Sequence, residues 1–148
     1  MTVAVIGAGE CDQDIYRLAY DAGRALAQSG YRIICGGLGG VMEAVCRGVR
    51  EAGGTSIGIL PGDDPGAANA YVDIPIATGM GIGRNIIIIR SADVVLAIDG
   101  SYGTLSEIAY ALQLGKPVIG LRTWQVSEKI VHCNNIAEAV NEIVKLVE

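Results

Sequence analysis

Short apolar runs alternate with amphipathic segments along the whole chain. These apolar runs predict five strands, at 3–6, 32–35, 56–60, 93–98 and 117–121, the first three of which end at glycine or proline. Apolar residues at helical spacing predict four helices. Three lie at 15–26, 41–52 and 104–114, and the fourth begins at Asn134 or Asn135 and runs to near the C-terminus. Repeated strand–helix units of this length favour a parallel sheet with right-handed crossovers and a helix layer on each face. The expected fold class is α/β, a doubly wound parallel sheet.

Two segments are harder to assign. The stretch 61–83 is rich in proline and glycine and is expected to be irregular, with a short strand near 71–74. Residues 86–89 are four consecutive isoleucines, which favour a strand, but only three residues separate them from the next predicted strand. An antiparallel hairpin and a helix both remain open for this run.

Composition narrows the class of protein. With 148 residues, 51% of them hydrophobic and only 18% charged, the chain is expected to be a single domain spanning 1–148. A net charge of -5 argues against binding to nucleic acid, which needs a basic surface. There is no apolar run long enough to span a membrane and no charged leader before the first strand, so a cytoplasmic protein is expected.

The cysteines indicate neither a metal site nor a disulfide framework. The four are Cys11, Cys35, Cys46 and Cys133, and no two form a CxxC pair. Buried thiols are the simplest interpretation. Cys11 and Cys35 each follow a strand and are expected to line or border a ligand pocket, whereas Cys46 is expected on a helix.

Ligands of open α/β sheets bind at the carboxyl ends of the strands, and three loops there are rich in glycine. The first, with Gly7 and Gly9, begins like a dinucleotide fingerprint, but Asp12 stands where the third glycine belongs. The second holds Gly36, Gly37 and Gly40, which serve either a phosphate or a close approach of helix and strand.

The third loop, 99–104, is the better phosphate site. Its glycines, Gly100 and Gly103, leave backbone N–H groups unobstructed just before a predicted helix. Thr104 and Glu107 have the spacing of a capping box, so both can be purely structural; alternatively, Glu107 faces a bound sugar. Arg84, between glycine and asparagine, is either solvated or a contact to a phosphate or base.

The residues of these loops, together with Arg84, resemble those of a known family, the Lonely Guy (LOG) proteins. Arg84 and the run 99–107, Asp-Gly-Ser-Tyr-Gly-Thr-Leu-Ser-Glu, match without a gap the segment of that family that holds an Arg-Lys pair and the motif PGGxGTxxE. The glycines from Gly36 to Gly40 and the strand that ends at Pro61 are similar to the region GGGxxGLMG and the strand after it. The resemblance covers about residues 2–121.

The resemblance implies a Rossmann-like, three-layer α/β/α domain that binds a phosphorylated nucleotide-like molecule. Lonely Guy enzymes, often mislabelled lysine decarboxylases, are phosphoribohydrolases that release the base from nucleoside 5'-monophosphates; their wider superfamily includes molybdenum-cofactor carriers and nucleotide sensors. Carried over, the catalytic residues are Arg84 and Glu107, and the Arg84 segment is helical, which favours a helix at 86–89. The residues expected at the ligand or its phosphate are Gly7, Gly9, Gly36, Gly37, Gly40, Gly100, Ser101, Gly103 and Thr104.

Three departures from the family pattern indicate a divergent branch. Asp99 replaces the proline of the motif, Ser101 replaces its second glycine, and Asn85 replaces the lysine after the catalytic arginine. Asp99 adds a negative charge near the expected phosphate and Asn85 removes a positive one. Two functions therefore stay open: hydrolysis of an N-glycosidic bond without metal or cofactor, or a carrier or sensor that binds a phosphorylated nucleotide or the molybdenum cofactor. A homodimer or higher homo-oligomer is expected, because the isoleucine run is too apolar for a helix with one solvated face.

Overall fold

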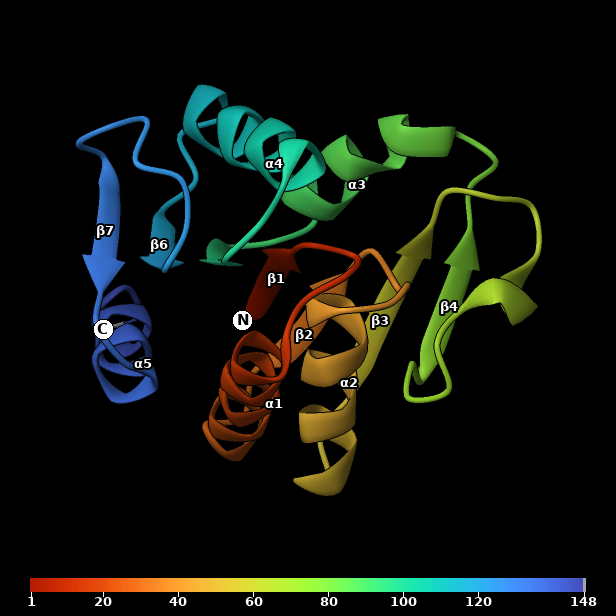
Figure 1. Cartoon of the computed structure of the whole chain (residues 1–148), viewed down its shortest axis with the longest axis horizontal. Coiled ribbons are helices and arrows are strands. Elements are labelled where there is room, and N and C mark those ends of the chain that lie inside the picture. The colour runs from red at the N-terminus through yellow and green to blue at the C-terminus, as the bar shows by residue number, and fades with distance from the viewer. Residues whose placement is uncertain (148) are drawn as a thin grey trace.

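A computed structural model describes residues 1–147, which form one seven-stranded sheet between two layers of helices (Figure 1). Every strand pair is parallel, and the spatial order is β4-β3-β2-β1-β5-β6-β7. The strands are β1 (Thr2–Gly7), β2 (Arg32–Cys35), β3 (Ser56–Leu60), β4 (Ile74–Ala77), β5 (Val94–Ile98), β6 (Val118–Leu121) and β7 (Ile130–Cys133). The expected fold class, a doubly wound parallel α/β sheet, is confirmed.

The helices divide between the two faces of the sheet. They are α1 (Gln13–Gln28), α2 (Val41–Glu51), α3 (Asn85–Arg90), α4 (Tyr102–Gln113) and α5 (Ile136–Lys145), with two short 3₁₀ helices, η1 (Pro65–Ala67) and η2 (Gly81–Arg84). Helices α1, α2 and α5 cover one face, and α3 and α4 cover the other (Figure 1). None of the helices within residues 1–147 is long and apolar enough to cross a membrane.

Alternation along the strands builds two separate cores. In β1, Val3 and Val5 pack against the α1/α2/α5 layer, and Ala4 and Ile6 pack against the α3/α4 layer. All four side chains are at most 1% exposed, so the run from Val3 to Ile6 is apolar and buried on both faces of the sheet. This is why a continuous apolar run, without visible alternation, marks a central strand in the sequence.

The edge strands account for two errors in the predicted elements. The short strand expected near 71–74 lies three residues later, at β4, and β7 was not predicted. Residues of β4 are mostly exposed, and so are Val131 and His132 of β7. An edge strand pairs on one side only and has little buried surface, so the local apolar pattern does not reveal it.

The isoleucine run forms a helix, as the family resemblance implied. Within α3, Ile88 and Ile89 are fully buried, whereas Ile86 and Ile87 are only half-buried.

The expected homo-oligomer stays a prediction, because Ile86 and Ile87 leave part of their apolar surface exposed. Light scattering at micromolar concentration should show at least a dimer, and a monomer would contradict it.

Candidate functional site

A cavity of about 160 Å³ lies at the junction of β1 and β5. Here the chain switches direction across the sheet: β2, β3 and β4 extend from one side of β1, and β5, β6 and β7 from the other (Figure 1). Such switch points are where open α/β sheets bind ligands. The residues that line the cavity are Val5, Ile6, Gly7, Gly9, Gly36, Met42, Ile82, Arg84, Asn85, Ser101, Gly103, Thr104 and Glu107.

The structure therefore brings together most of the residues predicted for the site. Gly7, Gly9, Gly36, Ser101, Gly103 and Thr104 reach the cavity together with Arg84 and Glu107, whereas Gly37, Gly40 and Gly100 do not line it. The prediction missed Val5, Ile6, Met42, Ile82 and Asn85 as wall residues. Asn85 had one signal, its position next to Arg84; the apolar wall residues had none that separates them from core.

The capping box predicted for Thr104 and Glu107 is wrong. Helix α4 begins at Tyr102, with Ser101 as its N-cap residue, and no side chain caps it. Thr104 is therefore inside the first turn and Glu107 inside the second. Because no side chain occupies the amides of the first turn, they remain free to bind an anion.

Thr104 supplies a further unused donor at this helix end. Its Oγ1 is buried and has no hydrogen-bond partner among the described residues. Gly100, at a φ of 122°, makes the tight turn beneath it, and a Cβ there would lie 2.5 Å from the Thr104 Cβ. A buried hydroxyl without a partner costs free energy, and Thr104 is one of the residues that line the cavity, so a ligand bound there could supply the missing acceptor.

Arg84 is held inside the protein by backbone carbonyls. It is 8% exposed, and its guanidinium donates to the Ile59 oxygen from Nε at 2.8 Å and to the Gly36 oxygen from Nη2 at 3.4 Å. A Cβ on Gly36 would lie 2.7 Å from that Nη2. Gly36 therefore makes room for the arginine, and Arg84 gives the cavity wall a fixed positive charge.

A polar chain joins Arg84 to the first turn of α4. The guanidinium donates to the Asn85 Oδ1, the Asn85 Nδ2 donates to the Ser106 Oγ at 3.3 Å, and Ser106 donates to the Gly103 oxygen at 2.6 Å. Asn85, read from the sequence only as a lost positive charge, is thus the link between the two walls of the cavity.

Glu107 is the other ionisable group of the cavity and is 7% exposed. Burial raises its pKa to about 8, and the nearby charge of Arg84 offsets part of this effect. Burial likewise lowers the pKa of Arg84, partly offset by Glu107. Below pH 8 the carboxyl is mostly neutral, so the two groups together leave the cavity positively charged.

Two predicted ligand glycines serve packing. A Cβ on Gly7 would lie 2.6 Å from the Ile98 oxygen, and one on Gly40 would lie 2.3 Å from the Ala8 oxygen. These glycines let β1, β5 and the start of α2 approach one another. Gly40 contributes to the site by bringing its walls together, whereas Gly7 also lines the cavity.

The two acidic residues near the glycine loops do not enter the cavity. Asp12 caps α1 by accepting from the Ile15 amide at 2.9 Å, so α1, unlike α4, has one of its N-terminal donors bound by a side chain. Asp99 does not line the cavity, and its carboxylate instead helps to raise the pKa of the Cys11 thiol, after burial and Asp12. The repulsion between Asp99 and a bound phosphate stays a prediction.

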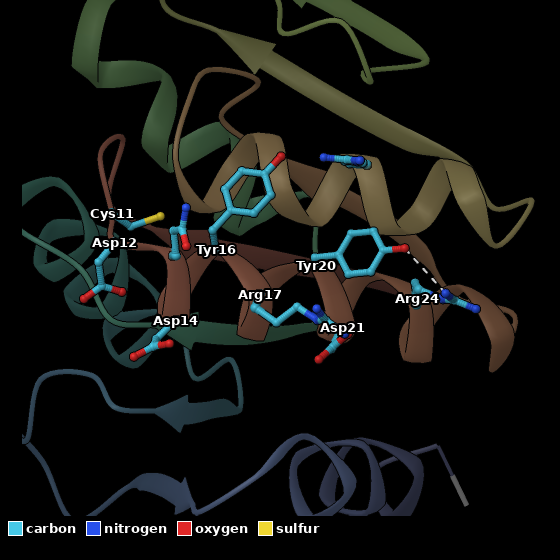
Figure 2. Close-up of a pocket in the computed structure, with 10 residues that line it drawn as sticks. Cys11, Asp12, Asp14, Tyr16, Arg17, Tyr20, Asp21 and Arg24 are labelled. Carbon is cyan, nitrogen blue, oxygen red and sulfur yellow. Dashed lines mark hydrogen bonds and ion pairs between the residues drawn. The ribbon is translucent and has the colours of Figure 1, made fainter.

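A larger hollow of about 820 Å³ runs along α1 (Figure 2). Its polar side chains bind one another: Arg24 donates to the Tyr20 hydroxyl at 3.4 Å, and Arg17 pairs with Asp21 at 3.6 Å. The hollow is open to solvent, and among its described lining residues no buried side-chain polar atom lacks a hydrogen-bond partner. Despite its larger volume, it is therefore the weaker candidate for a ligand site.

All four cysteines are free thiols, but only two are buried as expected. Cys35, directly before Gly36, and Cys46, on α2 as expected, are buried, whereas Cys11, which borders the hollow along α1, and Cys133 of β7 are partly buried. Neither Cys11 nor Cys35 is among the residues that line the cavity. The Sγ atoms of Cys35 and Cys46 are 3.5 Å apart. Contact of Cys11 or Cys35 with a ligand stays a prediction.

Residues 1–147 contain no group of three or more His, Cys, Asp or Glu that could hold a metal ion.

Known proteins resemble this chain in sequence and in structure. An uncharacterized protein of Archaeoglobus fulgidus is 47% identical over 95% of this chain and 93% of its own length. The solved molybdenum cofactor binding protein of Rippkaea orientalis has a TM-score of 0.94 and 33% identity over 99% of this chain and 97% of that one. The molybdenum cofactor carrier protein of Chlamydomonas reinhardtii has a TM-score of 0.90 and 31% identity over 99% and 98%.

These matches confirm the Rossmann-like fold and the relation to molybdenum-cofactor carriers, while membership of the Lonely Guy family itself stays a prediction. A family model described as the SLOG cluster4 family matches residues 1–146. The chain therefore belongs to the SLOG cluster4 family.

Proposed function

We propose that this protein binds a phosphorylated small molecule, the molybdenum cofactor or a close chemical relative, and carries it without hydrolysing it. The observation that carries the proposal is the buried, unpartnered Thr104 Oγ1 in the cavity wall, among the described residues, at the uncapped start of α4. A phosphate oxygen placed there accepts from this hydroxyl and from the amides of the first turn.

Charge and size both suit a phosphate group. Arg84 gives the cavity a positive charge, which Glu107 does not cancel while its carboxyl is neutral. The volume of about 160 Å³ is well below the roughly 300 Å³ at which pockets begin to enclose whole small molecules. The cavity thus takes the phosphate end of a ligand, and the rest of the ligand lies outside it. The molybdenum cofactor, a pterin that carries a phosphate ester, has such an end.

The carrier function is favoured over hydrolysis by the state of Glu107. Cleavage of an N-glycosidic bond develops positive charge on the ribose, which an ionised carboxylate stabilises. With a pKa raised to about 8 by burial, Glu107 is mostly protonated at pH 7 and supplies little of that charge. The two solved structures compared above, at 33% and 31% identity, are those of a molybdenum cofactor binding protein and a molybdenum cofactor carrier protein.

Thr104→Val should weaken the binding of inorganic phosphate at pH 7 by about tenfold or more, because a hydrogen bond to a charged acceptor is lost. The free protein should become more stable by about 1 kcal/mol, since the buried hydroxyl without a partner is removed. Titration calorimetry measures the first effect and urea unfolding the second.

Thr104→Ser is the matched control, because it keeps the hydroxyl and should retain most of the affinity. Equal phosphate binding by wild type and Thr104→Val would refute the proposed anion site. Incubation of the wild type with a panel of nucleoside 5'-monophosphates tests the carrier function: we expect no free base, and base release dependent on Glu107 would establish the hydrolase instead.

A further inference from the structure

An aromatic pair stands beside the proposed phosphate cavity. The rings of Tyr102 and Trp124 are stacked, with centroids 6.3 Å apart and planes at 26°. Tyr102 is the first residue of α4 and directly follows Ser101, which lines the cavity. The pair is therefore attached to the same helix end that presents the free amides.

Hydrogen bonds hold Trp124, the supporting ring of this pair, in place. The Trp124 Nε1 donates to the Ser101 oxygen at 3.1 Å, and the Thr123 Oγ1 donates to the Asp99 oxygen at 2.7 Å. The segment after β6 is thus bound to the loop after β5, and the indole supports one side of the Tyr102 ring. A ring held this way loses little conformational freedom when a ligand stacks on it.

Two large apolar side chains near the cavity are largely exposed to solvent. Tyr102 is 82% exposed, and Ile82, which lines the cavity from η2, is 86% exposed. The cavity itself is too small for more than a phosphate group, at about 160 Å³. A ligand anchored there by its phosphate must place the rest of its atoms on the surface around the opening.

We propose that Tyr102, supported by Trp124, is the stacking platform for a planar nitrogen heterocycle of the phosphorylated ligand. This inference rests on the proposed function and adds the residue that binds the ligand's fused heterocycle, a pterin or a purine, outside the phosphate cavity. Aromatic rings bind such heterocycles by offset stacking, with little dependence on their exact substituents.

The test compares two ligands that differ only in the heterocycle, guanosine 5'-monophosphate and ribose 5-phosphate. Guanine contains the same 2-amino-4-oxopyrimidine ring as a pterin. The wild type should bind the nucleotide about tenfold or more tightly than the sugar phosphate, by titration calorimetry. Trp124 is the single tryptophan of the chain, so only the nucleotide should quench its fluorescence.

Substitutions at Tyr102 assign the difference to its ring. Tyr102→Ala should reduce nucleotide affinity about tenfold and leave ribose 5-phosphate affinity unchanged, whereas Tyr102→Phe should behave like the wild type. Tyr110→Ala is the matched control, because Tyr110 is a partly exposed tyrosine on the same helix that does not line the cavity. It should change neither affinity.

The outcomes separate the platform from the phosphate site. If inorganic phosphate binds and Thr104→Val weakens it, but the nucleotide gains nothing over ribose 5-phosphate, the platform is refuted and the proposed function stands. The same holds if Tyr102→Ala leaves the ratio of the two affinities unchanged, or changes only the oligomeric state. If phosphate itself does not bind, the proposed function fails and the platform with it.

Discussion

Glu107→Gln should raise the free energy of unfolding at pH 8 by about 4 kcal/mol. The carboxyl is buried, and this burial raises its pKa to about 8, with Arg84 offsetting part of the effect. In the unfolded chain the pKa of a glutamate is about 4.3, so near neutral pH unfolding releases a proton and becomes more favourable. The amide of glutamine keeps the size and polarity of the side chain and removes this driving force.

The sign of the pH dependence follows from the same two states. Between about pH 4.3 and 8 the folded protein holds a proton on Glu107 that the unfolded chain has lost, so wild-type stability falls as pH rises. Glu107→Gln should remove this part of the slope, about 1.4 kcal/mol per pH unit, and should match the wild type near pH 4. Urea unfolding at several pH values measures both proteins.

Glu51→Gln is the contrasting control, because Glu51 is exposed and accepts hydrogen bonds from Tyr20 and Arg47. Its hydrogen bond with Tyr20 and its pairing with Arg47 lower the pKa of this carboxyl, so its loss should not raise stability at pH 8. A Glu107→Gln protein with the wild-type slope would show that the carboxyl is ionised in the folded state, and the argument against hydrolysis would lose its basis.

Gly48→Ala should lower the free energy of unfolding by about 2 to 3 kcal/mol. Helices α1 and α2 touch backbone to backbone: a Cβ on Gly48 would lie 2.1 Å from the Tyr20 oxygen, and one on Gly23 would lie 2.2 Å from the Val45 oxygen. Neither oxygen belongs to a flexible side chain, so the helices must separate. The better helix propensity of alanine, about 1 kcal/mol, offsets only part of this cost.

Gly62→Ala is the matched control, since nothing lies within 4 Å of the added carbon. It should change stability by less than about 0.5 kcal/mol. Urea midpoints of the two variants are compared with the wild type at one pH. A Gly48→Ala midpoint equal to that of Gly62→Ala would mean that the helices do not meet at this distance.

The sequence predicts the buried part of the fold well, for a physical reason. Strands β1 and β5 are covered on both faces, so their apolar runs are continuous and easily recognised. For the isoleucines of α3, local propensity favoured a strand, and only the family resemblance indicated the helix. What decides there is burial of Ile88 and Ile89 under α4, a contact that no local pattern contains.

The sequence predicted where the candidate site lies, but not what each of its residues does there. The motif with Thr104 and Glu107 pointed to the correct loop, yet their spacing fits a capping box as well as two walls of a cavity. The choice depends on where α4 begins: after the turn at Gly100 its N-cap residue is Ser101, three residues before the N-cap that the capping box requires. The link from Asn85 to Ser106 depends on the packing of α3 on α4, which sequence spacing does not encode.

The position of β1 in the middle of the sheet sets the order in which a growing chain can complete its binding site. Strands β2, β3 and β4 follow β1 in space as they do in sequence, so this half can pair during synthesis. The other edge of β1 receives β5 only later, when Val94 can pair with Val3. Until then the unpaired backbone edge of β1, with its apolar side chains Val3 to Ile6, is open to association with other chains, and the loop that holds Thr104 has not formed. A ligand that needs Thr104 therefore binds and stabilises only chains that have closed the sheet.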